Sequence, residues 1–243
     1  MHTFFVEIRD TLVPSPSSKD GPLPPLLVAM TLVTGLVDAY SYLVLGHVFV
    51  ANMTGNVVFL GFALAGARGF SVGASAAAMA SFSVGAFIGG WIARRAASDR
   101  SALFSTSTGI QVLLVAVAVA LAWLGGSQVA PGYRYGLIAM LAIAMGLQNA
   151  AVRKLAVPDL TTTVLTLTMT GMMADSAIVG GPGSRAGRRL VAVSAMFLGA
   201  LVGAACVIHA RAAISLSIAL VVLGAIGGTA FLLLRSRPTW AQA

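Results

Sequence analysis

The sequence has little charge and almost no cysteine, and both shortages restrict the class of protein. Only 9% of its 243 residues are charged and 58% are hydrophobic, whereas a soluble domain carries about 25% charged residues. A water-soluble globular fold is therefore excluded. The single cysteine, Cys206, lies inside an apolar run, so neither an intramolecular disulfide nor a cysteine-based metal site is available.

Sequence motifs for nucleotide chemistry and for hydrolysis are absent as well. The chain has no P-loop, nucleophile elbow, HExxH pair or dinucleotide fingerprint. An ATP-driven pump is thus excluded for this chain, and we expect no enzyme activity, no cofactor and no metal. The net charge of +8 does not indicate nucleic-acid binding, because the basic residues lie at the ends of apolar runs. The partner that the composition predicts is the lipid bilayer.

Long apolar runs dominate the chain. Six of them hold about 18–23 residues, enough to cross a hydrocarbon core about 30 Å thick. They are Leu26–Leu45, Val72–Ala93, Ala102–Leu124, Tyr135–Val152, Leu190–His209 and Ala212–Leu234. Two further segments, Val48–Ala67 and Leu160–Gly180, are too polar to face lipid. We therefore predict an all-α integral membrane protein with about six transmembrane helices and two short polar or re-entrant segments.

The distribution of Lys and Arg favours six crossings over eight. Eight crossings would divide the cations nine against six, whereas six crossings place twelve on one side and three on the other. The three are Arg68, Arg134 and Arg211. The twelve are Arg9, Lys19, Arg94, Arg95, Arg100, Arg153, Lys154, Arg185, Arg188, Arg189, Arg235 and Arg237. Such a bias marks the cytoplasmic side, so we expect both termini in the cytoplasm and the chain in the bacterial cytoplasmic membrane.

The N-terminal segment does not have the pattern of a signal peptide. Residues 1–25 contain three acidic residues and five prolines, with no apolar core before a small-residue cleavage site. We predict a disordered tail there, a single polytopic domain over 26–234, and a short C-terminal tail over 235–243. An alternative for part of the tail is one short interfacial turn, formed by Phe4, Phe5, Ile8 and Leu12.

The chain also contains an internal repeat, with halves of about 26–124 and 135–234. Three blocks recur in the same order: Gly35–Ala39 as Gly146–Ala150, Met53–Asn56 roughly as Leu165–Thr168, and Val84–Gly90 as Leu198–Ala204. Their offsets are 111, 112 and 114 residues. Three crossings per half is an odd number, so the two halves must be inverted. Inverted repeats with broken helices are the plan of many secondary transporters.

Two motif blocks carry a family resemblance. Gly35–Ala39 is followed by Phe49–Asn56, and Gly146–Ala150 is followed by Val157–Thr166. In these blocks the chain resembles the YoaK-like family of bacterial membrane proteins, over about Leu26–Leu234. The resemblance implies a polytopic inner-membrane protein and supplies no activity, because the family is a domain of unknown function. Members of that family usually have Gly where Leu167 stands here.

Asp38 is the most informative single residue. It lies 13 residues into an apolar span, where a carboxylate costs at least about 2.5–3.5 kcal/mol. No Lys or Arg inside a predicted span can pair with it. One interpretation is a titrating or cation-binding group. The other is a cap for a helix broken near Gly35, with its oxygens bound by backbone N–H groups. Its repeat counterpart, Asn149, is the neutral isostere.

Other polar residues complete the candidate ion or solute site. They are Gln148, Asn149, Asn52, Thr54, Asn56, Thr162, Thr166, Thr170 and Asp175. The three threonines are spaced by four and share a helix face, which could line a path or simply pack between helices. Asn52, Thr54 and Asn56 offer ligands on a bend, or a cap for a helix beginning at Val57. Asp175 is either a second membrane carboxylate or an interfacial residue.

Two functions of different classes follow. The favoured one is a small secondary transporter or channel for a small polar solute or ion. The alternative is a membrane-embedded interaction or assembly protein without a substrate. An intramembrane enzyme is less favoured, since the spacing of Asp38 and Asp175 does not indicate a catalytic dyad. Three GxxxG patterns indicate close helix packing and permit a homodimer; they are Gly85…Gly89, Gly199…Gly203 and Gly224…Gly228.

Overall fold

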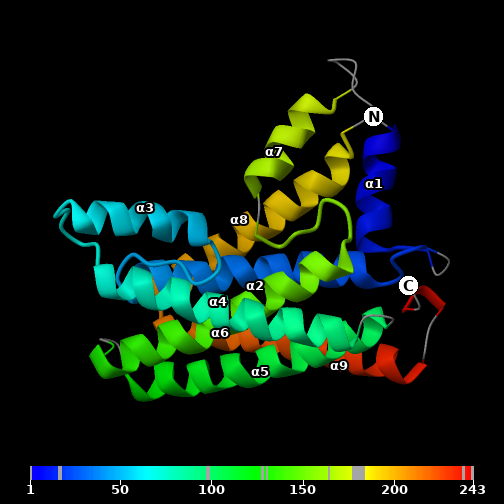
Figure 1. Ribbon diagram of the computed structural model, residues 1–243. Helices are drawn as coiled ribbons and strands as arrows, with labels where there is room; N and C mark the ends of the chain where they lie inside the picture. The colour runs from blue at the N-terminus through cyan, green and yellow to red at the C-terminus, as the bar shows by residue number, and fades with distance from the viewer. Residues whose placement is uncertain are drawn as a thin grey trace.

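The computed structural model describes residues 2–15, 18–96, 99–126, 129, 131–163, 165–176, 184–236 and 239–241. Across these residues the regular structure is helical, as predicted (Figure 1). The helices are α1 His2–Leu12, α2 Leu23–Val44, α3 Met53–Leu64, α4 Val72–Arg95, α5 Arg100–Leu124, α6 Pro131–Leu155, α7 Leu165–Ala174, α8 Ala186–His209 and α9 Ala212–Ser236, followed by a short 3-10 turn at Thr239–Ala241. Six of them (α2, α4, α5, α6, α8 and α9) are long and apolar enough to cross a membrane.

Local chemistry explains where the long helices begin. Prolines stand in the first turn of α2, where a missing N–H costs nothing. The side chain of Ser71 caps α4 by accepting a hydrogen bond from the N–H of Ala74 at 3.2 Å. The carboxylate of Asp99 caps α5 by accepting from the N–H groups of Ser101 and Ala102, each at 2.9 Å. The crossings consequently begin within about four residues of the predicted positions.

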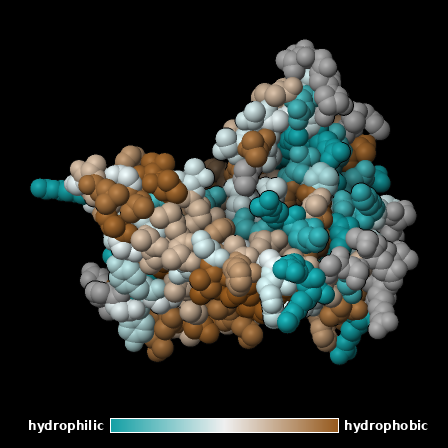
Figure 2. Space-filling model, in the orientation of Figure 1, coloured by the Kyte–Doolittle hydropathy of each residue, from teal (hydrophilic) through white to brown (hydrophobic). Residues whose placement is uncertain are grey.

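The two short helices do not cross. α3 has 12 residues and α7 has 10, or about 18 and 15 Å of helix, against a hydrocarbon core of about 30 Å. α3 lies at the end of the bundle where α2 finishes, and α7 lies toward the opposite end, where α6 finishes (Figure 1). The surface of α3 is apolar (Figure 2), with Val57 and Leu64 strongly exposed. It therefore suits contact with lipid, so the prediction that segment Val48–Ala67 is too polar to face lipid is wrong for its helical part.

The internal repeat appears in the structure as one helix crossing built twice. α2 crosses α8 at Gly35, where an added Cβ would lie 2.4 Å from the carbonyl oxygen of Met196. α6 crosses α4 at Gly146, where it would lie 2.1 Å from the carbonyl oxygen of Phe82. The two glycines are 111 residues apart and their two partners are 114 apart, which are the offsets found in the sequence. Each half thus contributes one helix to each crossing.

The two halves run in opposite directions through the bundle. α2, α5 and α8 point one way, and α4, α6 and α9 point the other way (Figure 1). The first, second and third long helices of one half are therefore antiparallel to their counterparts in the other half. This is the inverted arrangement predicted from an odd number of crossings per half.

Most of the GxxxG glycines are used inside the chain. Gly85 and Gly89 pack on α6, and Gly199 and Gly203 pack on α2. These four glycines are thus occupied and do not offer a dimer face. Around Gly224 and Gly228 the described residues place no atom within 4 Å of an added Cβ. A homodimer remains a prediction, and this last pattern is the one that could mediate it.

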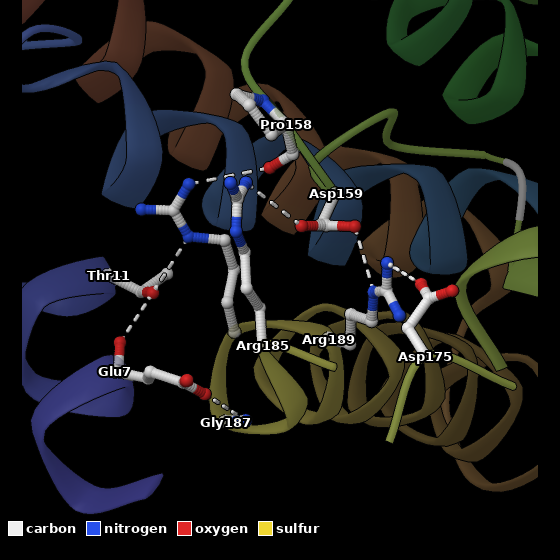
Figure 3. A network of polar contacts seen from close by, with 9 residues as sticks. Glu7, Thr11, Pro158, Asp159, Asp175, Arg185, Gly187 and Arg189 are labelled. Carbon is white, nitrogen blue, oxygen red and sulfur yellow. Dashed lines mark hydrogen bonds and ion pairs between the residues drawn. The ribbon is translucent and has the colours of Figure 1, made fainter. Parts of the chain in front are cut away.

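The sequence predicts a disordered tail at the N-terminus, and the structure instead has helix α1 there, docked on the start of α8 (Figure 3). The Glu7 carboxylate accepts a hydrogen bond from the N–H of Gly187 at 2.9 Å, which satisfies a free donor in the first turn of α8. The Thr11 hydroxyl donates to the carbonyl of Glu7 and accepts from the Arg188 side chain. These contacts to α8 hold the helix, which includes Phe4, Phe5, Ile8 and Leu12 of the alternative interfacial turn and ends before the first proline, Pro14.

The cations gather at one end of the bundle. The course of the chain places eleven of the predicted twelve at the end that carries α1, the α4–α5 turn and the start of α8. Arg237 lies outside the described residues. Figure 2 shows hydrophilic surface collecting toward that end, and hydrophobic surface over α3 and the middle of the bundle. We refer to it below as the basic end.

Candidate functional site

Asp38 holds the loop that leads into α3. Its carboxylate accepts hydrogen bonds from the backbone N–H groups of Val50 and Ala51, at 3.2 and 3.0 Å, and from the side-chain amide of Asn52. The residue is only 4% exposed. α2 continues unbroken past Gly35, so the predicted helix break is wrong. The carboxylate nevertheless binds backbone N–H groups, which come from the following loop rather than from its own helix.

A second lock closes the same loop. The Asn56 side chain donates to the carbonyl of Phe49 at 2.6 Å and accepts from its N–H at 2.8 Å. Asn56 is fully buried. Thr54 is exposed on α3 and takes no part. α3 begins at Met53 rather than at the predicted Val57. Asp38, Asn52 and Asn56 therefore hold the loop before α3 closed by hydrogen bonds. We call these three residues and that loop the sealed gate.

The second half repeats this gate in a weaker form. The Thr163 hydroxyl donates to the side-chain oxygen of Asn149 at 2.6 Å. Thr163 lies 14 residues after Asn149, as Asn52 lies 14 after Asp38. The NH₂ group of Asn149 donates a hydrogen bond to the backbone carbonyl of Met145 in the same helix. We call Asn149, Thr163 and the surrounding segment 156–163 the open gate. Its partial exposure contrasts with the burial of Asp38.

The structure therefore does not bring the predicted site residues together in one place. Asp38, Asn52 and Asn56 belong to the sealed gate, and Asn149 belongs to the open gate. Thr166 and Thr170 are exposed on α7. Thr162 precedes that helix, with a φ of 61°, so the predicted threonine face is not formed.

Between the gates lies a buried amide network. The Gln148 side chain donates to the hydroxyls of Thr34 and Thr162, at 3.0 and 3.1 Å, and accepts from the Gln111 amide at 2.6 Å. All four residues are at most 3% exposed. They come from α2, α5, α6 and the open gate, so the network joins both halves at their interface.

Part of this network has unused hydrogen-bonding capacity. Within the described residues, Gln111 Oε1 and the hydroxyls of Ser107 and Thr108 are buried without a partner. Gln111 was missed in the sequence, although it is the one amide in the span Ala102–Leu124. Like Asp38, it is a polar group inside an apolar run.

A cavity of about 940 Å³ adjoins the open gate. Asn149, Thr161 and Thr163 contribute polar atoms to its wall, next to the network residues Gln148 and Thr162. Small and apolar residues of α4 and α6 line the rest, together with Arg94, Arg153 and Lys154 of the basic end. The lining is Phe82, Ala86, Gly90, Ala93, Arg94, Asn149, Ala150, Val152, Arg153, Lys154, Ala156, Val157, Thr161 and Thr163.

Asp175 belongs to an ion-pair network at the basic end, which joins the open gate through Asp159 (Figure 3). Arg189 contacts Asp159 at 2.8 Å and Asp175 at 2.9 Å, and Asp159 also pairs with Arg185 at 3.5 Å. Of the two alternatives for Asp175, the structure therefore fits the interfacial one. Because Asp159 lies in segment 156–163 and Asp175 follows α7, Arg189 fastens both to α8.

Removing the cation should release this fastening. We expect Arg189→Ala to cost about 2 kcal/mol, less than the roughly 3–5 kcal/mol of a fully buried pair that loses one partner, because the network is partly exposed. Amide hydrogen exchange over 165–174 should become faster. Asp175→Asn is the matched control and should cost under about 1 kcal/mol, since the Asp175 side chain is 42% exposed. Equal rates of amide hydrogen exchange over 165–174 in Arg189→Ala and in the unmodified chain would contradict the role of Arg189 in fastening α7 to α8.

Together these features define a class: a polytopic membrane protein of two inverted repeats, each with a short half-helix behind a polar gate. The family model described as "Protein of unknown function (DUF1275)" matches residues 26–229. The chain belongs to this family, which covers most of its length and agrees with the resemblance in the motif blocks.

A relative with a curated description is the UPF0700 transmembrane protein YoaK of Bacillus subtilis (strain 168). It is 31% identical over 156 residues, which is 62% of this chain and 65% of YoaK. The match thus spans slightly less than two thirds of that relative. No solved structure matches the chain.

Proposed function

We propose that the protein is a small secondary transporter for a small polar solute or ion, and that it works by alternating access. The observation that carries the proposal is the difference between the two gates. The loop around Asp38 is buried, whereas the equivalent segment around Asn149 is partly exposed and lies beside the 940 Å³ cavity. In inverted-repeat transporters, exchange of such conformations between the halves moves access from one side to the other.

The buried amide network supports the same proposal. A polar group in hydrocarbon without a partner is costly, yet Gln111 Oε1 lies unpaired beside Gln148, among described residues of both halves. Groups that retain hydrogen-bonding capacity at a repeat interface suit a polar solute that passes between the gates. We place the basic end in the cytoplasm because of its excess of cations, which makes the present conformation open to the cytoplasm.

Paired cysteines test the alternation. Thr161 is exposed at the cavity, and its repeat counterpart Val50, 111 residues earlier, is fully buried. In a Cys206→Ser background, Thr161→Cys should react with a membrane-impermeant maleimide in inside-out vesicles. Val50→Cys should react more slowly and only from the opposite side, in right-side-out vesicles. The position of the native Cys206 in α8, outside both gates, makes its replacement suitable as the background.

Coupling between the two positions is the decisive measurement. In a chain carrying both cysteines, blocking Thr161→Cys from inside should hold the open gate apart and thereby prevent labelling at Val50→Cys from outside. Val50→Cys alone, treated in the same order, is the control. If Val50→Cys never reacts, or reacts regardless of the block, alternating access is wrong, and the assembly-protein alternative takes its place.

A further inference from the structure

We propose that the cavity between α4, α6 and segment 156–163 is a binding site for an organic anion with an apolar body. The ligand class is a phosphate or carboxylate head on a chain or ring of several carbons. The proposal concerns binding alone, and it holds whether or not the ligand is carried across the membrane.

Charge is the first argument. Arg94, Arg153 and Lys154 all line the cavity, and its lining among the described residues includes no Asp or Glu. The nearby carboxylates are committed elsewhere: Asp20 pairs with Arg100 at 2.9 Å and Asp159 with Arg189 at 2.8 Å. Three cations with no carboxylate partner in the described structure thus face one cavity. Arginine forks recognise phosphate and carboxylate oxygens by paired hydrogen bonds.

The positive-inside bias alone does not account for this grouping. At the opposite end a cavity of about 510 Å³ has Arg211 in its lining, and there the guanidinium lies 5.7 Å from the Trp123 ring centroid. That cation has an aromatic partner. Among the described residues, the three cations of the cavity beside the open gate have no equivalent contact.

The shape and chemistry of the inner wall give the second argument. Phe82, Ala86 and Gly90 of α4 form an apolar side. Gly90 has no described atom within 4 Å of the position that a Cβ would take, so it faces open space. The volume is within the range of about 300–1,000 Å³ that small-molecule sites occupy. An inorganic anion would leave the apolar side empty, whereas an organic anion would cover it.

The third argument is orientation. The hydroxyl of Thr161 and the second N–H of the Asn149 amide lie in the same wall, where they can donate hydrogen bonds to the oxygens of an anionic head. We therefore expect the anionic head to lie near the cations and the apolar tail to lie along α4. A free organic phosphate or carboxylate would bind in this orientation, and so would the headgroup and first acyl carbons of an anionic lipid.

Binding to the full chain in a neutral detergent tests the site. The probes are hexyl phosphate, inorganic phosphate and hexylammonium. We expect hexyl phosphate to raise the unfolding temperature by about 5 °C at about 100 times its Kd, and the other two to leave it unchanged. Arg153→Gln and Lys154→Gln should each weaken hexyl phosphate binding about tenfold, as loss of one charge-assisted contact does.

Filling the cavity separates binding from general charge effects. Gly90→Leu keeps every cation and should abolish hexyl phosphate binding. Gly109→Leu, in α5 with open space around it, is the matched control for the added side chain, and Arg211→Gln is the control for a lost cation. Both controls should bind like the unmodified chain.

Equal stabilisation by hexylammonium, or unchanged affinity in Gly90→Leu, would overturn the proposal. Equal stabilisation by inorganic phosphate would likewise overturn it, because no apolar body would then be recognised. Added phosphatidylglycerol, compared with phosphatidylcholine, distinguishes the sources. Displacement of hexyl phosphate by phosphatidylglycerol supports the site as a lipid-headgroup site, and its absence supports a soluble anion. The result is independent of the labelling experiment, so either proposal can fail without the other.

Discussion

Gly85→Leu and Gly146→Leu should each abolish the folded protein. An added Cβ at Gly85 would lie 2.1 Å from the carbonyl oxygen of Ile143, and one at Gly146 would lie 2.1 Å from that of Phe82. Both obstacles are backbone atoms, which cannot rotate away. The helices would have to separate, and the close contact that stabilises helix pairs in lipid would be lost. Yield of monodisperse protein after solubilisation is the measurement.

Alanine at the same positions gives a graded version of this experiment. Overpacking a tight contact typically costs about 1–3 kcal/mol, while replacing Gly by Ala in a helix favours folding by about 1 kcal/mol. We therefore expect a net loss of up to about 2 kcal/mol for Gly85→Ala. Gly90→Ala, five residues along the same helix and without a described neighbour within 4 Å, lacks the clash and should be neutral or slightly stabilising. Similar unfolding temperatures for the two variants would contradict the close contact between α4 and α6 at Gly85.

The repeat extends this prediction to the other crossing. A Cβ added at Gly199 would lie 2.1 Å from the carbonyl oxygen of Leu32, just as one added at Gly85 would from that of Ile143. Gly199→Leu should thus resemble Gly85→Leu. If one crossing tolerates leucine and the other does not, the two crossings do not contribute equally to stability.

The crossings could be predicted from the sequence because they depend on length and composition alone. A run of about 20 apolar residues has few alternatives in a membrane. The repeat could also be predicted, and its offset relates the contacts of one half to those of the other. Asn52 plus 111 is Thr163, so once Asn52 is known to contact Asp38, the contact between Thr163 and Asn149 follows.

The N-terminal helix and the gates could not be predicted in the same way. Glu7 contacts Gly187, 180 residues away in the chain, and local composition says nothing of that contact. The partners of Asp38 depend on how loop 45–52 turns back over α2. The sequence indicated that the carboxylate needs partners, but it could not distinguish backbone N–H groups from a cation.

Asp38→Leu is the other change for which we expect a large effect. It would leave the backbone N–H groups of Val50 and Ala51 buried without their acceptor, and each unpaired buried donor costs about 1–3 kcal/mol. The sum, about 2–6 kcal/mol, is comparable with the whole stability of a marginal protein. We expect low yield and a large fall in unfolding temperature.

Asp38→Asn should fold, and that makes it the informative variant. The new amide keeps one oxygen for the two backbone donors. Its NH₂ group would meet the Asn52 amide, which can rotate by half a turn and present its own oxygen. The pair would then resemble the neutral Asn149–Thr163 pair of the open gate. We expect a loss of under about 1.5 kcal/mol, the size of one ordinary hydrogen bond.

The gate itself should nevertheless weaken in Asp38→Asn. Hydrogen bonds to a carboxylate are roughly twice as strong as those to a neutral acceptor, so the sealed gate would open more often. Val50→Cys should then be labelled faster from the side opposite the basic end, with labelling at Thr161→Cys unchanged. Thr54→Ala, exposed on α3, is the control and should change neither rate. Unchanged labelling of Val50→Cys in Asp38→Asn would mean that the charge of Asp38 does not hold the gate closed. If solute binding in that variant also lost its dependence on pH or Na⁺, Asp38 would instead be a titrating group.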